Sequence, residues 1–230
     1  MEGISIILTA FNSQDFIEET LDSIERQTYF QDNNEYEVLL GIDACENTLQ
    51  KVNTIRGKYR NLKVYLNERN VGTFVTGNSL IQKAKYDYIL PFDTDDVMRP
   101  EMVETLMRNL GEMVRFKMQN FGGDSLVLDT WRVALIRKEC FLKINGYRDW
   151  KCGADSDLVK RFEQCFTVRR IPDVLFDRRV HPASLTNARS TNFNSRYRKR
   201  IISFVEDGRN YSTRARCILS KMSVVSQTQV

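Results

Sequence analysis

Apolar positions along the first 110 residues follow two alternating spacings. Buried strands are predicted where short apolar runs rich in Ile, Val and Leu occur, at residues 4–8, 38–42, 64–66 and 88–92. Amphipathic helices are predicted where apolar residues recur every three or four positions, at about 16–24, 49–55, 72–84 and 102–110. Strand and helix therefore alternate for four rounds. This order is typical of an α/β fold with a mostly parallel central sheet flanked by helices.

The second half of the chain has a less regular pattern. Its apolar positions predict a strand near 133–136, a short helix near 138–145 and a helix from about 157 to 166. We expect a loop around Asp177–Ser184, and then an amphipathic helix over about 195–205 that ends at Gly208. The pattern predicts a single domain over 1–190 with a C-terminal helical tail over 191–230.

The composition narrows the class of protein. The chain has 230 residues, of which 42% are hydrophobic and 28% charged, as in an ordinary globular domain. No apolar run approaches the ~18 residues of a membrane span, and the strand-like run Ile4–Leu8 begins so early that we expect no signal peptide. The five cysteines form no CxxC pair, so we expect neither a disulfide framework nor a zinc site. These features fit a cytoplasmic location and exclude collagen, coiled coils, channels and disordered chains.

The net charge of +4 is distributed unevenly. Residues 191–230 contain eight Lys or Arg and two Asp or Glu, a balance of +6, whereas residues 1–190 carry a balance of −2. The basic run Arg196–Arg200 is followed by four apolar residues, namely Ile201, Ile202, Phe204 and Val205. This combination predicts either a solvated helix or a peripheral contact with the cytoplasmic face of an anionic membrane. No nucleic-acid partner is expected, because the basic residues form no groove interleaved with aromatic side chains.

Three carboxylates stand together directly after the fourth predicted strand, in Asp93-Thr94-Asp95-Asp96. Such groups repel one another unless a cation or a network of hydrogen-bond donors neutralises them. Carboxylate oxygens suit Mg²⁺ or Mn²⁺, which proteins commonly share with substrate phosphates. The cluster therefore predicts a divalent-metal site at the carboxyl end of a parallel strand, where α/β folds bind ligands. The alternative is a solvated turn with an aspartate that caps the next helix.

Three other polar residues each allow a chemical and a purely structural interpretation. His181, the only histidine, is either a metal ligand beside Arg178 and Arg179 or an exposed loop residue. Asp155 stands at the start of a predicted helix, where it is either a general base or a residue that opposes the helix macrodipole. Asp43 follows the second strand. Its carboxylate either accepts the imino N–H of uracil, thymine or guanine, or caps a helix.

Six segments of the chain form a series in a fixed order. They are Ile4–Asn12, Asn70–Asn78, Tyr88–Pro100, Asn145–Tyr147, Gly153–Leu158 and Arg179–Ser184. In this order, and over roughly residues 3–186, they resemble the segments of family 2 glycosyltransferases of the GT-A fold. The third is similar to that family's Y-I-x-F-L-D-x-D-D segment, and the last to its R-x-H-x-x-S. The resemblance implies an inverting transfer of a sugar from a nucleotide-diphosphate donor to a hydroxyl of a glycan or lipid-linked acceptor, with Mn²⁺ or Mg²⁺.

The resemblance also implies a role for each residue around the metal. Asp95 would be its first protein ligand and His181 a second, while Asp93 would hold the ribose or a metal-bound water. Arg179 would face the diphosphate. Asp155 would accept the proton of the acceptor hydroxyl, a step that typically contributes ~10²–10⁴-fold to the rate.

The remaining implied roles divide the domain into two halves. Residues 1–98 would bind the donor nucleotide, with UDP as the first expectation, through Thr9, Phe11, Asp43 and Asn78. Residues 99–190 would bind the acceptor. These two halves would hold both substrates in a cleft between them.

The chain departs from the family pattern at four positions: Thr9 in place of a proline, Ile42 in place of the first of two aspartates, Gly77 in place of an arginine near the nucleotide, and Ala154 in place of a glutamate. Gly77 and Ala154 favour an alternative, a catalytically degenerate nucleotide-binding or scaffold subunit. A nucleotidyltransferase is another alternative, although Thr9–Ser13 lacks the expected Gly-rich phosphate loop. Because Asp155 is retained, we expect an active enzyme.

Overall fold

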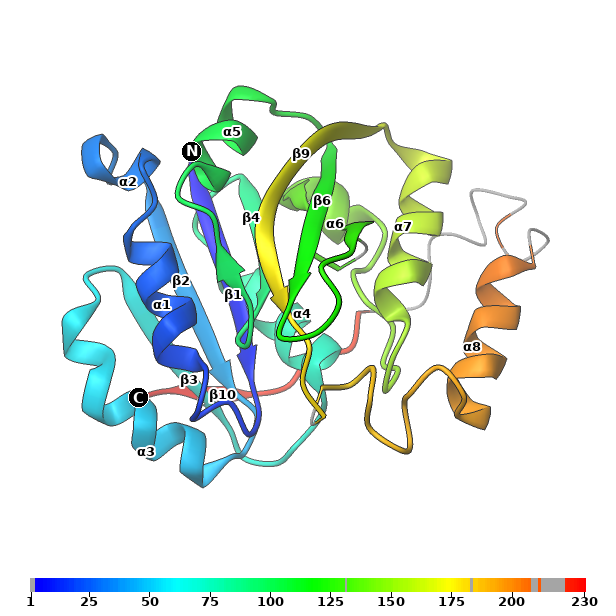
Figure 1. Cartoon of the computed structure of the whole chain (residues 1–230), viewed down its shortest axis with the longest axis horizontal. Helices are drawn as coiled ribbons and strands as arrows, with labels where there is room; N and C mark the ends of the chain where they lie inside the picture. Colours follow the sequence, from blue (N-terminus) through cyan, green and yellow to red (C-terminus); the bar gives the residue numbers. More distant parts are fainter. Residues whose placement is uncertain (1–2, 131, 183, 208–210, 212–221) are drawn as a thin grey trace.

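A ten-stranded sheet organises the molecule (Figure 1). The computed structural model describes residues 3–130, 132–182, 184–207, 211 and 222–230. Within them the strand order is β10-β3-β2-β1-β4-β8-β6-β9-β5, with β7 paired to β6. The first-half strands are β1 (Ile4–Ala10), β2 (Tyr36–Ile42), β3 (Leu62–Asn67) and β4 (Tyr88–Asp93). Neighbours among these four strands are parallel, which confirms the fold class that the apolar runs predict.

Helices cover both faces of this sheet. The residues of β1 alternate between the faces, with Ile4, Ile6 and Leu8 in one buried cluster and Ile7 in the other. The first cluster also contains apolar side chains of α1 (Ile17–Glu25), α3 (Glu46–Ile55) and α5 (Met102–Arg108). The second contains those of α4 (Thr73–Lys83), α6 (Lys138–Lys143) and α7 (Ala154–Cys165). Short α2 (Tyr29–Asp32) and a single turn of 3-10 helix, η1 (Arg56–Lys58), complete the connections in this part of the chain.

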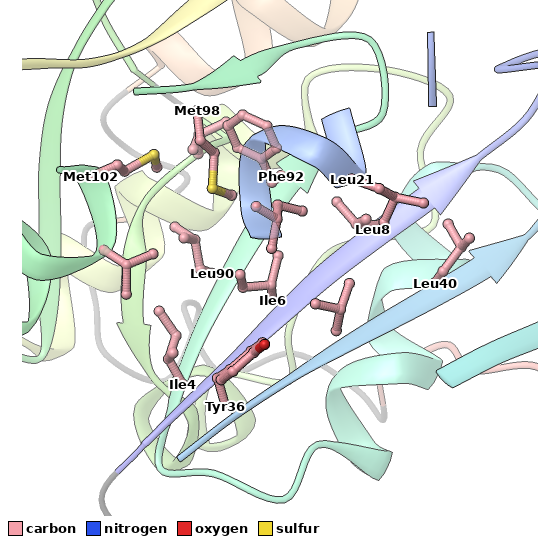
Figure 2. Packing of buried hydrophobic residues seen from close by; sticks show 14 of the residues in the cluster. Ile4, Ile6, Leu8, Leu21, Tyr36, Leu40, Leu90, Phe92, Met98 and Met102 are labelled. Atoms are coloured by element: carbon pink, nitrogen blue, oxygen red, sulfur yellow. The ribbon is translucent and has the colours of Figure 1, made fainter. Parts of the chain in front are cut away.

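The first cluster is the larger core, and Figure 2 shows its centre. Ile6 of β1 is fully buried between Val38 of β2 and Leu90 of β4, its neighbours in the sheet. Full burial of an aliphatic side chain of this size stabilises a fold by about 1.5–3 kcal/mol. The first parallel strands are therefore a rigid platform for the loops at their carboxyl ends.

The structure also contains strands that the apolar pattern did not predict, namely β5 (Val97–Met98), β6 (Met113–Phe121), β7 (Val127–Asp129) and β9 (Val168–Arg179). The strand predicted near 133–136 is confirmed as β8 (Leu135–Arg137). The loop predicted around Asp177–Ser184 begins later than expected, because β9 runs in parallel beside β6 through Arg179. β5 pairs antiparallel with β9, Val97 facing Asp177. This pairing holds the turn after β4 against the end of β9.

The predicted helical tail is helical only in part. Helix α8 (Arg196–Glu206) begins at Ser195, whose hydroxyl accepts the N–H of Arg198 at 3.2 Å, while its predicted end at Gly208 lies outside the described residues. Strand β10 (Gln227–Gln229) pairs antiparallel with β3. In Figure 1 this last segment, in red, runs back to the first half of the chain and ends beside β3. The division at residue 190 stays a prediction, but part of the tail belongs to the sheet.

The apolar residues of α8 are in contact with the rest of the fold. Val205 is buried, and the ring of Phe204 packs edge-on against Trp150 at 5.6 Å between centroids. The side chain of Ile201 lies directly against Gly153 at the start of α7. These contacts use the residues that were expected to face a membrane, so the peripheral membrane contact receives no support. Among the described residues, no helix is long and apolar enough to cross a bilayer.

Candidate active site

The acidic turn at the end of β4 is fixed in place by its last carboxylate. Asp96 is 4% exposed and accepts the backbone N–H of Arg179 at 2.9 Å. Burial raises the pKa of Asp96 well above its usual value, and the carboxylates of Asp95 and Asp93 raise it further. The turn is therefore not the solvated one of the structural alternative, and the next helix, α5, begins after Glu101 without an Asp96 cap.

Asp95 and His181, 86 residues apart in the sequence, come together at this turn. Their Oδ2 and Nε2 atoms are 2.8 Å apart, and both side chains are partly buried. The imidazole ring packs against Phe16 with 4.8 Å between centroids. The backbone carbonyl of His181 accepts the side-chain N–H of Asn187 at 2.7 Å. The sole histidine is thus a positioned group rather than an exposed loop residue.

This pair has the chemistry of a divalent-metal site. A neutral imidazole and a carboxylate are both ligands for Mn²⁺, and the carboxylate also suits Mg²⁺. Among the described residues, no group of three or more His, Cys, Asp or Glu side chains is arranged to hold a metal ion. An ion held here would therefore keep several coordination positions for substrate oxygens or water, which is how Mg²⁺ is usually bound with phosphates.

Asp93 has a different partner, Arg132, which the sequence analysis did not single out. The Nε atom of Arg132 lies 3.0 Å from Oδ1 of Asp93, and the side chains are 12% and 38% exposed. Burial raises the pKa of Asp93, which the carboxylates of Asp95 and Asp155 raise further and the guanidinium of Arg132 lowers. Asp93 is therefore a carboxylate among like charges, balanced by one guanidinium in direct contact.

The same guanidinium joins the end of β1 to the start of α4. It donates to the hydroxyls of Thr9, at 2.9 Å, and Thr73, at 2.5 Å. A side-chain carbon at Gly77, in the next turn of α4, would lie 3.8 Å from the Thr9 methyl. Arg132 thus brings a positive charge to Thr9, beside the position where the family pattern has an arginine and this chain has Gly77. No periodicity marks Arg132, because it lies in the connection between β7 and β8.

Asp155 lies in the first turn of α7. The helix begins after Gly153, whose φ of +78° favours glycine. Oδ1 of Asp155 accepts the N–H of Ser156 at 2.9 Å. Two residues further, the fully buried Asp157 binds Arg161 at 2.7 Å, an ion pair inside the fold. The acidic residues of this helix therefore divide into a cavity-lining Asp155 and a structural Asp157.

Two cavities meet at the acidic turn, and Asp93 and Asp95 line both. The β-end cavity, about 1150 Å³, lies at the carboxyl ends of β1 to β3, and its walls include Thr9, Phe11, Asn12, Asp43, 69–73 and His181. The α7 cavity, about 980 Å³, is lined by side chains of β6, β9, α7 and α8, including Arg132, Asp155 and Arg178. The structure thus separates the predicted nucleotide contacts from the predicted base, with the acidic turn between them.

The residues predicted to contact the nucleotide differ in their exposure and in the hydrogen bonds that they already make. Phe11 is 52% exposed at the cavity wall, so it is not a core residue. Thr9 lines the same wall with its hydroxyl bound to Arg132. Asp43 is 3% exposed, and its carboxylate already accepts the backbone N–H groups of Val71 and Gly72 at 2.9 and 2.8 Å. Asp43 therefore orients the loop before α4, and any contact with a base must share its oxygens.

Two predicted contacts have other uses in the structure. Asn78 is fully buried, and its amide donates to the carbonyls of Tyr147 and Ser223 and accepts the N–H of Tyr147. It is a positioning residue in this structure, which gives the predicted direct nucleotide contact no support. The side chain of Arg179 pairs with Glu19 and donates to the Asp95 carbonyl at 3.0 Å. It braces the turn, while Arg178 is a further guanidinium that lines the α7 cavity.

The sheet, its helices and the cleft at the strand ends define a GT-A-type fold. The structure of Staphylococcus aureus TarS 1-349 in complex with UDP matches with a TM-score of 0.68 at 19% identity, over 92% of this chain and 72% of that one. The mannosyltransferase PcManGT from Pyrobaculum calidifontis, in complex with GDP-Man and Mn²⁺, matches with a TM-score of 0.65 at 17% identity, over 79% and 58%.

Residues 5–157 match the family model described as "Glycosyl transferase family 2", and the chain belongs to this family. The poly(ribitol-phosphate) beta-glucosyltransferase of Bacillus spizizenii is 36% identical over 102 residues, 43% of this chain and 16% of that protein. The chondroitin synthase of Pasteurella multocida is 28% identical over 106 residues, 46% of this chain and 10% of that protein. The chain thus spans a minor part of the length of both relatives.

Proposed function

We propose that this protein is an inverting, metal-dependent glycosyltransferase that uses a nucleotide-diphosphate sugar. The observation that carries the proposal is the pair of Asp95 and His181 at the junction of the two cavities. The β-end cavity would bind the nucleotide and the α7 cavity the acceptor. The diphosphate of the donor would then lie at the acidic turn, where the pair could hold a divalent ion beside it.

Each group has one task in this mechanism. Asp95 and His181 would hold Mn²⁺ or Mg²⁺, which supplies Lewis-acid stabilisation of the leaving diphosphate. Arg132 would favour the ionised form of Asp93 and hold its carboxylate in place beside the donor, and Thr9 and Phe11 line the nucleotide side. Asp155, on the other side of the turn, would accept the proton of the attacking hydroxyl. Attack from the face opposite the leaving group inverts the sugar carbon.

UDP remains the first expectation for the nucleotide. Asp43 offers an acceptor to the imino N–H of uracil, although guanine and thymine present the same donor. A solved structural neighbour contains UDP-GlcNAc and another contains GDP-Man, so the fold accommodates both types of donor. The proposed acceptor is a hydroxyl of a glycan, polymer or lipid-linked molecule. The names of several relatives refer to polymer acceptors. A cytoplasmic location stays a prediction.

Calorimetry tests the nucleotide and the metal together. UDP, GDP and dTDP are titrated with Mn²⁺, with Mg²⁺ and with EDTA into wild type, Asp95→Ala and His181→Ala. We expect one nucleotide to bind with metal, and each variant to weaken this binding at least about 10-fold. Asp173→Ala, which removes an exposed carboxylate of β9, is the matched control and should bind as wild type. Equal binding in EDTA would refute metal dependence.

A measurement of turnover then distinguishes an active enzyme from a catalytically degenerate scaffold, the alternative that Gly77 and Ala154 favour. Arg132 brings a positive charge near Gly77, and Asp155 lines the α7 cavity, and both observations support an active enzyme. Release of nucleoside diphosphate from a nucleotide sugar, by transfer or by hydrolysis, would establish activity. Binding of a nucleotide without release of product from any tested donor would favour the scaffold.

A further inference from the structure

A segment far from the family motifs forms part of the wall of the β-end cavity. Residues 222–225 line it together with Phe11 and 69–73. This segment lies beyond residue 157, where the family match ends. It also belongs to the region that was expected to be a basic helical appendage. Its place in the cavity therefore needs a separate explanation.

Hydrogen bonds hold this segment on both sides of Val224. The carbonyl of Ser223 accepts the Asn78 amide at 2.9 Å, and the N–H of Val225 donates to the Ser79 hydroxyl at 2.7 Å. Further along, β10 pairs with β3, and the N–H of Val230 donates to the carbonyl of Val64 at 3.0 Å. The segment is thus anchored to α4 and to the edge of the sheet.

The anchoring also connects the segment to the loop before α7. The side-chain amide of Asn78 donates both to the carbonyl of Ser223 and to the carbonyl of Tyr147. Gly146 leaves the space that Met222 fills, since a side-chain carbon there would collide with the Met222 sulfur. One buried amide therefore joins 222–225, α4 and the loop that leads to Asp155.

Within the segment, Val224 is an apolar side chain that the fold leaves available. It is 45% exposed and lines the cavity, as does the 52% exposed Phe11. Pockets for small molecules combine such apolar surfaces with a few polar groups. In this cavity Phe11 and Val224 offer apolar surface, and the polar groups include the acidic turn and Asp43.

We propose that residues 222–225 are part of the donor site and that Val224 contacts the nucleoside of the bound donor. This proposal rests on the proposed function, because it assigns the β-end cavity to a nucleotide. Val224 is a binding residue in it, and Asn78 and Ser79 are positioning residues that hold the segment in place. Bound nucleotide would cover the exposed valine, and a polar side chain of similar size would lose that contact.

A matched pair of substitutions tests the proposal. Val224→Asn and Val230→Asn both replace a valine near the end of the chain, and neither introduces a charge. The valine side chains are 45% and 42% exposed. Only Val224 is among the residues that line the cavity. We expect Val224→Asn to weaken nucleoside diphosphate binding about 5- to 20-fold in calorimetry. Val230→Asn and the conservative Val224→Ile should stay within about twofold of wild type.

The outcomes separate this proposal from the proposed function. In one outcome, wild type binds UDP, GDP or dTDP with metal and Val224→Asn binds it with unchanged affinity. That result overturns the role of the segment and leaves the enzyme proposal intact. Equal weakening in Val224→Asn and Val230→Asn, with equally lowered melting temperatures, also overturns it, because the effect would then be general destabilisation. Absence of binding to all three nucleotides by wild type would overturn both proposals.

Discussion

Replacing Arg132 by alanine removes the one guanidinium in direct contact with Asp93 among the described residues. The carboxylate would then face Asp95 and Asp155 without this counter-charge. Removing one partner of a fully buried ion pair costs about 3–5 kcal/mol, but Asp93 is 38% exposed, so we expect about 1–2 kcal/mol. For a protein of this length, this corresponds to a fall of about 2–8 °C in melting temperature.

The pH dependence of the stability lost in Arg132→Ala identifies the cause of that loss. The folded pKa of Asp93 lies above its unfolded value, so the folded state binds more protons and its stability falls as pH rises through that window. Without Arg132 the folded pKa rises further. The stability difference between wild type and Arg132→Ala should therefore grow as pH rises above the usual pKa of an aspartate. Thermal unfolding at a series of pH values measures it.

A double-mutant cycle gives the decisive control. Asp93→Asn removes the charge that Arg132 balances, so Arg132→Ala should cost less in that background than in wild type. Arg137→Ala removes an exposed guanidinium that pairs with Glu139 at 3.6 Å and should cost at most about 1 kcal/mol. The same loss from Arg132→Ala in both backgrounds, independent of pH, would refute the electrostatic reasoning and leave only the hydrogen bonds to Thr9 and Thr73.

Three other substitutions test separate parts of the site and its support. Asp155→Asn should keep nucleotide binding but lower turnover at least about 10²-fold, and near-wild-type turnover would exclude it as the base. Among the described residues the buried Tyr147 hydroxyl has no hydrogen-bond partner, so Tyr147→Phe should change the free energy of unfolding by less than about 1 kcal/mol in denaturant titrations. Arg161→Met leaves the fully buried Asp157 without its nearest partner and should cost about 3–5 kcal/mol in the same assay, whereas a loss below about 1 kcal/mol would contradict the ion-pair assignment.

Local pattern predicts the first half of the fold well because its strands are buried on both faces. Runs such as Ile4–Leu8 and Val38–Ile42 are almost entirely apolar, which distinguishes them from the helices between them. β6 and β9 lack this signal. β6 mixes apolar and basic residues, and β9 contains Pro172 at an irregular point of its pairing with β6. The length of each of these two strands depends on its pairing with the other. The partner lies too far away in the sequence for a short stretch of residues to predict that pairing.

The residues of the candidate site also divide into those that the local sequence indicates and those that depend on distant contacts. The acidic turn could be located from the sequence because three carboxylates follow an apolar strand, and His181 because it is the sole histidine. Arg132 could not, since its role depends on a contact with Asp93 across 39 residues of chain. The burial of Asn78 could not be predicted from the sequence either, because its partner Ser223 lies 145 residues away. Motifs identify residues that matter, and only packing shows whether they face a ligand or the protein.

The pairing of β5 with β9 makes the contact between Asp95 and His181 a product of complete folding. Residues 1–98 contain Asp95 but not His181, and the two side chains meet only when Val97 and Asp177 are in register. A ligand that binds only the folded state stabilises it, so an ion held by this pair would stabilise the pairing of the two strands as well. Register in a strand has a period of two, and a slip of one residue reverses every side chain. A single insertion between Asp177 and His181 would therefore be expected to abolish metal binding while the parallel core stays folded.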